Sequence, residues 1–180
     1  TPGLGGEVLT KMGGTVVNMP AGEIFTAMQT GAIDATEWIG PYNDLALGLH
    51  KAAKYYYTPG WQEPNVTFEL DVNLKAWETL PDDLKAIVRA AARDVNGDML
   101  DDYNAKNMEA MEQLKADGVE VRRLPDEVLA RLKEVAAEVV EASANADPVA
   151  KKVWEQQKAY LQRLYDYAES NEKDIYNIRG

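Results

Sequence analysis

The sequence predicts an α/β protein in which short strands alternate with helices at first and long helices dominate later. Segments with the two-residue period of strands stand between helical segments up to about residue 75, and long helical patterns with one short strand follow. We therefore expect an α/β segment at residues 1–75, with a crossover strand and the loops of the candidate site. Residues 76–180 should be helical, with one short strand at 118–124 and a terminal helix of the dimerisation type. Pattern alone leaves the topology open.

In the first part, glycines mark the ends of the helices, because glycine is the usual residue just after a helix. Tyr55–Tyr57 stand in an extended segment and must face both sides. The elements that we predict here, in order, are a helix ending at Gly13, a strand at 15–17, a helix at 21–30 ended by Gly31, a strand at 32–39, a helix at 43–55 and a strand at 66–73.

In the second part, a long helix begins near Asp82 and ends at Gly118. It is followed by a strand at 119–124 and by a helix at 125–143. The last helix has Asp147 as its N-cap and Pro148 at its first position, and it runs to about Ser170. Apolar residues of the long helix recur at three- and four-residue steps, which predicts one buried stripe: Leu84, Val88, Ala91, Val95, Met99 and Tyr103.

Composition excludes several classes of function. Thirty acidic against 19 basic residues give a net charge of −11, which disfavours nucleic acid as a partner. No apolar run approaches the roughly 18 residues of a membrane-spanning helix. The chain has no cysteine, and His50 is its single histidine, so thiolate sites and multi-histidine zinc sites are excluded. We see no activated nucleophile and predict a binding protein rather than an enzyme.

Two loops carry candidate binding residues. Glu37 and Trp38 close a predicted strand, and ligand sites of open α/β sheets lie at the carboxyl ends of strands. Trp61 and Glu63 lie in a second loop, together with Gln62. Carboxylate and amide oxygens suit Na⁺, Ca²⁺ or Mg²⁺. For Glu37 and Trp38 there is an alternative, in which Trp38 packs in the core and Glu37 is solvated, and spacing alone slightly favours it.

The final helix is apolar around most of its circumference, which indicates burial on several faces. Because the helix is terminal, a second copy of the chain is a reasonable source of the additional contact, and we predict a homodimer through it. The residues concerned are Val149, Val153, Trp154, Tyr160, Leu161, Leu164, Tyr165, Tyr167 and Ala168.

Two stretches resemble a known family. Residues 20–44, PAGEIFTAMQTGAIDATEWIGPYND, and residues 51–64, KAAKYYYTPGWQEP, are similar to the substrate-binding subunits of TRAP transporters, in the branch that binds α-keto acids and lactate. The resemblance implies a periplasmic, two-lobed α/β protein that delivers a small carboxylate to a membrane permease. It also implies a cation that bridges to the ligand, held by the side chain of Glu37 and the backbone carbonyl of Trp38.

The resemblance covers only the C-terminal half of such a protein. The family's ligand-binding arginine lies just before the Pro-Gly-Leu-Gly-Gly stretch, and this sequence starts at Thr1. We therefore expect a chain that has lost its natural start and that binds its ligand poorly or not at all by itself. The sequence does not decide whether the cation is Na⁺ or Ca²⁺, nor which 2-oxo or 2-hydroxy monocarboxylate (pyruvate-like or lactate) is bound. An alternative function also remains open: a helical interaction or structural module with a vestigial cleft, without ligand transport.

Overall fold

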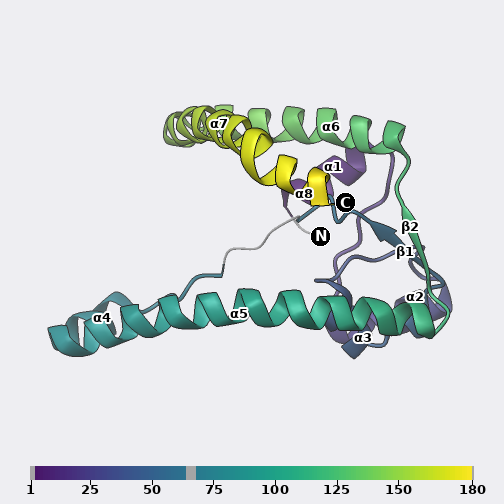
Figure 1. Cartoon of the computed structure of the whole chain (residues 1–180), viewed down its shortest axis with the longest axis horizontal. Helices are drawn as coiled ribbons and strands as arrows, with labels where there is room; N and C mark the ends of the chain where they lie inside the picture. Colours follow the sequence, from purple (N-terminus) through teal and green to yellow (C-terminus); the bar gives the residue numbers. More distant parts are fainter. Residues whose placement is uncertain (1–2, 64–67, 180) are drawn as a thin grey trace. The chain divides into compact units, whose positions relative to one another are not determined.

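The computed structural model describes residues 3–63 and 68–179 (Figure 1). The chain divides into two units, each with its own internal contacts: one is formed by residues 16–129, the other by residues 3–15 together with 130–179. The predicted division near residue 75 into an α/β part and a helical part stays a prediction.

The first unit is built around a two-stranded parallel sheet. Strand β1 pairs with β2 in a register that runs from Tyr55 opposite Glu120 to Thr58 opposite Arg123. Figure 1 shows α3 beside the C-terminal half of the long helix α5. The elements of this unit are α2 (Ala21–Thr30), α3 (Pro41–Ala46), the 3₁₀ turn η1 (Leu49–Lys51), β1 (Tyr55–Thr58), α4 (Leu74–Thr79), α5 (Asp82–Ala116) and β2 (Glu120–Arg123).

The second unit is helical. Its buried side chains come from α1 and from α6, where Val135 and Val139 are almost completely covered. Trp154 on α7 donates its indole N–H to Glu141 on α6 at 2.9 Å. The elements are α1 (Leu4–Lys11), most of α6 (Asp126–Asn145), α7 (Pro148–Ala168), the π-helical turn η2 (Glu169–Lys173) and α8 (Asp174–Arg179).

Helix boundaries that rest on capping residues agree with the prediction. Gly31 follows α2 in the left-handed conformation with φ 74°, which only glycine adopts without strain. The side chain of Asp147 accepts hydrogen bonds from the N–H groups of Val149 and Ala150, at 2.8 and 2.9 Å. These are two of the donors that a helix start leaves unpaired.

Several predicted elements are wrong. Residues 15–17 and 32–39 form no strand, and of the segment predicted as a strand at 66–73 the described part, 68–73, is irregular, while Val66 and Thr67 lie outside the described residues. The predicted helix at 43–55 is divided into α3 and η1, because Gly48 adopts φ 76° between them. The strand predicted at 119–124 does form, as β2, but its partner is β1, about 65 residues earlier in the chain and not among the predicted strands. The two-residue hydrophobic period of a segment cannot show with which distant segment it pairs.

None of the six residues of the predicted stripe of α5 is buried: Leu84 and Val95, for example, are 42% and 62% exposed, so the prediction of one buried stripe is wrong. The buried residues of this helix are Ala110 and Leu114, at 4% and 1% exposed, which lie beyond the stripe near the C-terminal end. Among the described residues, no helix is both long and apolar enough to cross a bilayer.

Candidate functional site

A hydrogen bond between side chains joins the two predicted loops of the site. Gln62 donates its amide N–H to the carboxylate of Glu37 at 3.2 Å, and both side chains are half-buried. Trp38 and Trp61 are also half-buried, whereas Glu63 is exposed. The structure therefore joins Glu37 to the amide of the second loop rather than to its carboxylate. The hydroxyl of Thr36 donates to the carbonyl oxygen of Glu37 at 3.2 Å.

The position of this loop depends on a residue that the sequence analysis missed. Asp44, only 8% exposed, accepts hydrogen bonds from the backbone N–H of Ile39 at 3.3 Å and from the hydroxyl of Tyr56 at 2.7 Å. Glu37 does not close a strand, so the strand-end argument for its position was wrong. A turn held by a buried carboxylate takes the place of the strand end. The available signal was an aspartate just after Gly40-Pro41, in the first turn of α3.

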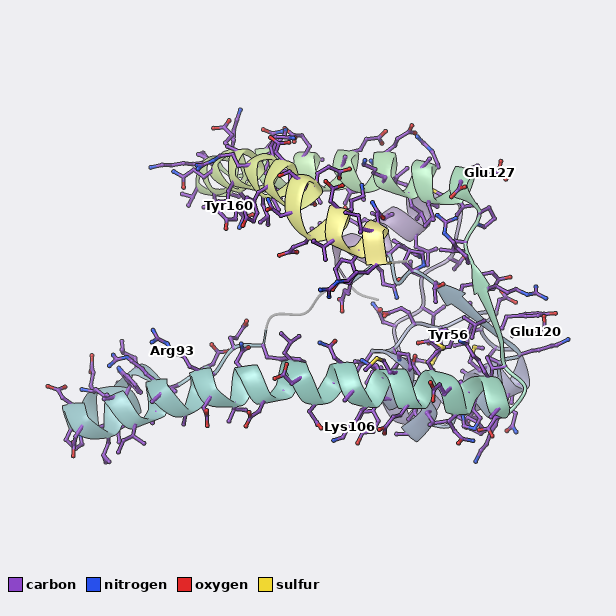
Figure 2. The ribbon with its side chains drawn as sticks, viewed as in Figure 1. Tyr56, Arg93, Lys106, Glu120, Glu127 and Tyr160 are labelled. Carbon is purple, nitrogen blue, oxygen red and sulfur yellow. The ribbon has the colours of Figure 1, made fainter. Side chains whose placement is uncertain are left out.

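Burial governs the ionisation of this pair. Burial raises the pKa of Asp44 above its usual value, although the hydrogen bonds from Tyr56, Ile39 and Gly40 act in the opposite direction. The pKa of Tyr56 is also raised, first by burial and then by its hydrogen bond to Asp44. Tyr56 thus remains a hydrogen-bond donor at neutral pH. Figure 2 labels Tyr56 on β1.

Helix α3 is fixed in turn on α5. The side-chain oxygen of Asn107 accepts a hydrogen bond from the backbone N–H of Tyr42 at 3.0 Å. The ring of Tyr42 packs edge-on against that of Tyr103, with centroids 6.1 Å apart, and the ammonium group of Lys106 lies 5.1 Å from the Tyr42 ring centroid. A Cβ added to Gly40 would meet the Asn107 oxygen at 3.3 Å, so the backbone approaches α5 closely here. The covered end of α5 therefore supports the loop.

The donors of this site suit a hard cation only in combination with other ligands. Among the described residues, no group of three or more His, Cys, Asp or Glu side chains could hold a metal ion. Glu37 offers a carboxylate and Trp38 a main-chain carbonyl, both of which are oxygen donors that Ca²⁺ accepts. A cation of the usual six to eight ligands would need further oxygen atoms from amides, water or a bound carboxylate. Glu37 and Trp38 therefore fit a cation site as two of its oxygen ligands.

Two surface hollows lie away from these residues. One of about 320 Å³ is lined by residues 50–54 and 117–119, and the other by residues of α7 that include Tyr160. Neither includes Glu37 or the other predicted site residues. In the first hollow, His50 lies 3.9 Å from the carboxylate of Asp117 and its side chain is 12% exposed, as expected for a structural histidine.

Comparison with known proteins identifies the family. The family described as bacterial extracellular solute-binding protein, family 7, matches residues 1–147. A monocarboxylate 2-oxoacid-binding periplasmic protein of Nostoc is 40% identical over 177 residues, which are 98% of this chain and 49% of that protein.

Two solved structures are also similar. A TRAP solute-binding protein of Colwellia psychrerythraea with bound calcium and pyruvate is 34% identical, with a TM-score of 0.92 over 98% of this chain and 54% of that one. A TRAP solute-binding protein of Bordetella bronchiseptica, described as a dimer with calcium and picolinate in an active site, is 34% identical, with a TM-score of 0.89 over 98% and 53%.

The chain thus spans about half the length of the relatives it matches. The matched family consists of solute-binding proteins rather than enzymes, and the relatives are periplasmic, as predicted. The α/β fold with two short parallel strands matches about half of the structure of such proteins. The chain belongs to family 7 of the bacterial extracellular solute-binding proteins, the TRAP-type periplasmic binding proteins.

Proposed function

We propose that this chain forms part of a periplasmic protein that captures a small 2-oxo or 2-hydroxy monocarboxylate, pyruvate-like or lactate, and delivers it to the membrane permease of a TRAP transporter. The observation that carries the proposal is the contact between Glu37 and Gln62, which places a carboxylate and an amide side by side next to Trp38. The similarity to a 2-oxoacid-binding protein and to a protein with bound pyruvate supports the ligand class.

A cation completes this proposal. Glu37 would bind it through the side chain and Trp38 through the backbone carbonyl, and the ion would neutralise the carboxylate of the incoming solute. Calcium in two similar proteins favours Ca²⁺, with Na⁺ as the alternative. The chain carries a net charge of −11, and a bound cation would supply positive charge for the solute's carboxylate beside the acidic Glu37. Trp61 and Glu63 are proposed to contact the solute from the second loop.

Calorimetry on the complete polypeptide that carries this sequence tests the proposal. Pyruvate and lactate are titrated in the presence of calcium and again after chelation with EDTA. We expect binding that depends on calcium and a loss of at least about tenfold in affinity in Glu37→Gln, or roughly 1.4 kcal/mol. Glu23→Gln, an exposed carboxylate on α2, is the matched control and should bind as the wild type does. Failure of both acids to bind with calcium supplied would reject the proposal.

We further propose a homodimer through the C-terminal helices. None of the described residues of α7 and α8 is buried, although many are large and apolar, such as Tyr165 at 64% and Ile178 at 79% exposed. One of the similar structures is described as a dimer. Tyr165→Glu should shift the protein toward monomers in sedimentation velocity, whereas Gln156→Glu, at an exposed position of the same helix, should not. A wild-type monomer at micromolar concentration would count against this assembly.

The same apolar helices favour the second candidate, an interaction module without ligand transport. Removal of residues 147–180 distinguishes the two functions. A truncated protein that keeps full affinity for the carboxylate and an unchanged oligomeric state would argue against the module.

A further inference from the structure

We propose that Asp44 positions the backbone carbonyl of Trp38, and that it thereby controls the cation site through a single peptide unit. The inference rests on the proposed function, since it assigns that carbonyl a cation to bind. Asp44 itself would contact neither the cation nor the solute, so its role is that of a positioning residue.

The geometry follows from the planarity of the peptide bond. The carbonyl of Trp38 and the N–H of Ile39 belong to the same peptide unit, and in a trans peptide they point in opposite directions. Among the described residues, the cis peptide bond lies between Thr58 and Pro59, so the Trp38–Ile39 bond is trans. Asp44 accepts the hydrogen bond of the Ile39 N–H at 3.3 Å. A carboxylate that fixes the direction of this N–H also fixes the direction of the carbonyl.

Asp44 is itself held by elements on either side. The hydroxyl of Tyr56, on β1, donates to its second oxygen at 2.7 Å. Its own helix, α3, is fixed to α5 by the hydrogen bond from the Tyr42 N–H to Asn107 at 3.0 Å. The carboxylate therefore has little freedom to rotate or withdraw. Outer groups of this kind are known to orient the ligands of metal sites and to tune their affinity.

The burial of Asp44 supports an orienting role. It is the one buried polar or charged side chain in the described part of the molecule. Taking a carboxylate out of water is unfavourable unless hydrogen bonds compensate, and here a main-chain donor and a phenol do so. An ionised acceptor also polarises the peptide to which it is bonded, which places more negative charge on the Trp38 oxygen. Asparagine would keep one oxygen for the Ile39 N–H, but it carries no charge and has an amide N–H where Asp44 accepts from Tyr56.

The test measures calcium affinity of the complete polypeptide by calorimetry, with calcium chloride as the probe. We expect Asp44→Asn to weaken calcium binding by about 10- to 100-fold, in the range found for outer-shell substitutions. Tyr56→Phe should weaken it by a smaller factor, because Asp44 keeps Ile39 but loses the donor that fixes its second oxygen. Tyr176→Phe, an exposed tyrosine of α8, should leave it unchanged.

Val135→Ala separates positioning from general stability. Val135 is 0% exposed and lies on α6, outside the binding loops and the helices that hold them, so this variant should be destabilised while it keeps calcium affinity as long as it is folded. If Asp44 acted only through stability, Asp44→Asn would behave like the core variant, and it would keep its calcium affinity as long as it is folded. Hydrogen exchange of the Ile39 amide gives a second readout, since Asp44→Asn should increase its rate.

The outcomes distinguish this inference from the function on which it rests. If Glu37→Gln loses calcium and Asp44→Asn binds as the wild type does, the positioning role is overturned and the proposed function stands. If the wild type binds no calcium, both are overturned. Should Asp44→Asn fail to fold, Tyr56→Phe decides: an affinity equal to that of Tyr176→Phe would overturn the positioning role.

Discussion

The two ends of α5 carry the same helical periodicity but differ in what covers them. Near the C-terminal end Ala110 and Leu114 are buried, and Asn107 binds the backbone of α3. Toward the N-terminal end Ile87 and Val95 are 61% and 62% exposed. A periodic pattern thus shows which face of a helix could be buried, not what buries it. The covered end positions the candidate site, whereas the uncovered end contributes nothing to it in this structure.

The largest difference should come from equivalent substitutions at the two ends. Leu114→Ala creates a cavity in a packed site and should lower the free energy of unfolding by about 2–5 kcal/mol. Leu100→Ala, in the same helix at 60% exposed, should change it by less than about 0.5 kcal/mol. Urea denaturation measures both. Equal losses would show that the uncovered half of α5 is buried in solution.

The next effect concerns the buried hydrogen bond beside the site. Tyr56→Phe leaves one oxygen of Asp44 without its donor, which should cost about 1–3 kcal/mol of stability. Tyr176→Phe removes a hydroxyl from a residue that is 79% exposed and should cost nothing measurable. If both variants unfold at the wild-type denaturant concentration, the hydroxyl of Tyr56 does not bind Asp44 in solution.

A smaller effect is expected where α3 meets α5. Asn107→Ala removes the acceptor of the Tyr42 N–H, and a typical hydrogen bond contributes about 0.5–1.5 kcal/mol. Asn104, one turn away and exposed, provides the matched control, and Asn104→Ala should be close to neutral. Thermal unfolding by circular dichroism compares the two. A greater loss in the control would mean that α3 packs elsewhere on α5.

The smallest effect is a pH dependence. Because the pKa of Asp44 is raised by folding, the folded state binds its proton more tightly than the unfolded state does. Its contribution to stability is therefore complete below about pH 3.8, the ordinary value, and declines as the pH rises through the folded-state pKa. The stability of the wild type relative to Asp44→Asn should decrease over that interval. Urea denaturation at a series of pH values measures it, and a constant difference would contradict the burial of an ionisable Asp44.

Sequence reasoning succeeded where a local signal determines the structure. The glycine after α2 and the aspartate before α7 set helix ends through their own backbone and side-chain hydrogen bonds. It failed where the decisive partner is distant in sequence. Strand β1 exists because residues 120–123 pair with it, and Ala32–Ile39 finds no comparable partner in the described structure.

The candidate site shows the same limit. Sequence similarity and residue chemistry indicated Glu37 and Trp38, together with the second loop. They did not indicate that Gln62 rather than Glu63 contacts Glu37, nor that Asp44 holds the turn. Both facts depend on contacts between segments whose relative positions no local pattern encodes. A buried aspartate is recognisable only once its donors, one of them on β1, are in place.

A crystal structure of the complete polypeptide, grown with calcium and pyruvate, tests the central claim most directly. We expect anomalous density for one calcium ion with oxygen ligands from the Glu37 carboxylate and the Trp38 carbonyl, each at about 2.3–2.6 Å. The Ile39 N–H should still point to Asp44. A calcium ion bound elsewhere, with Glu37 directed into solvent while pyruvate is bound, would contradict the site.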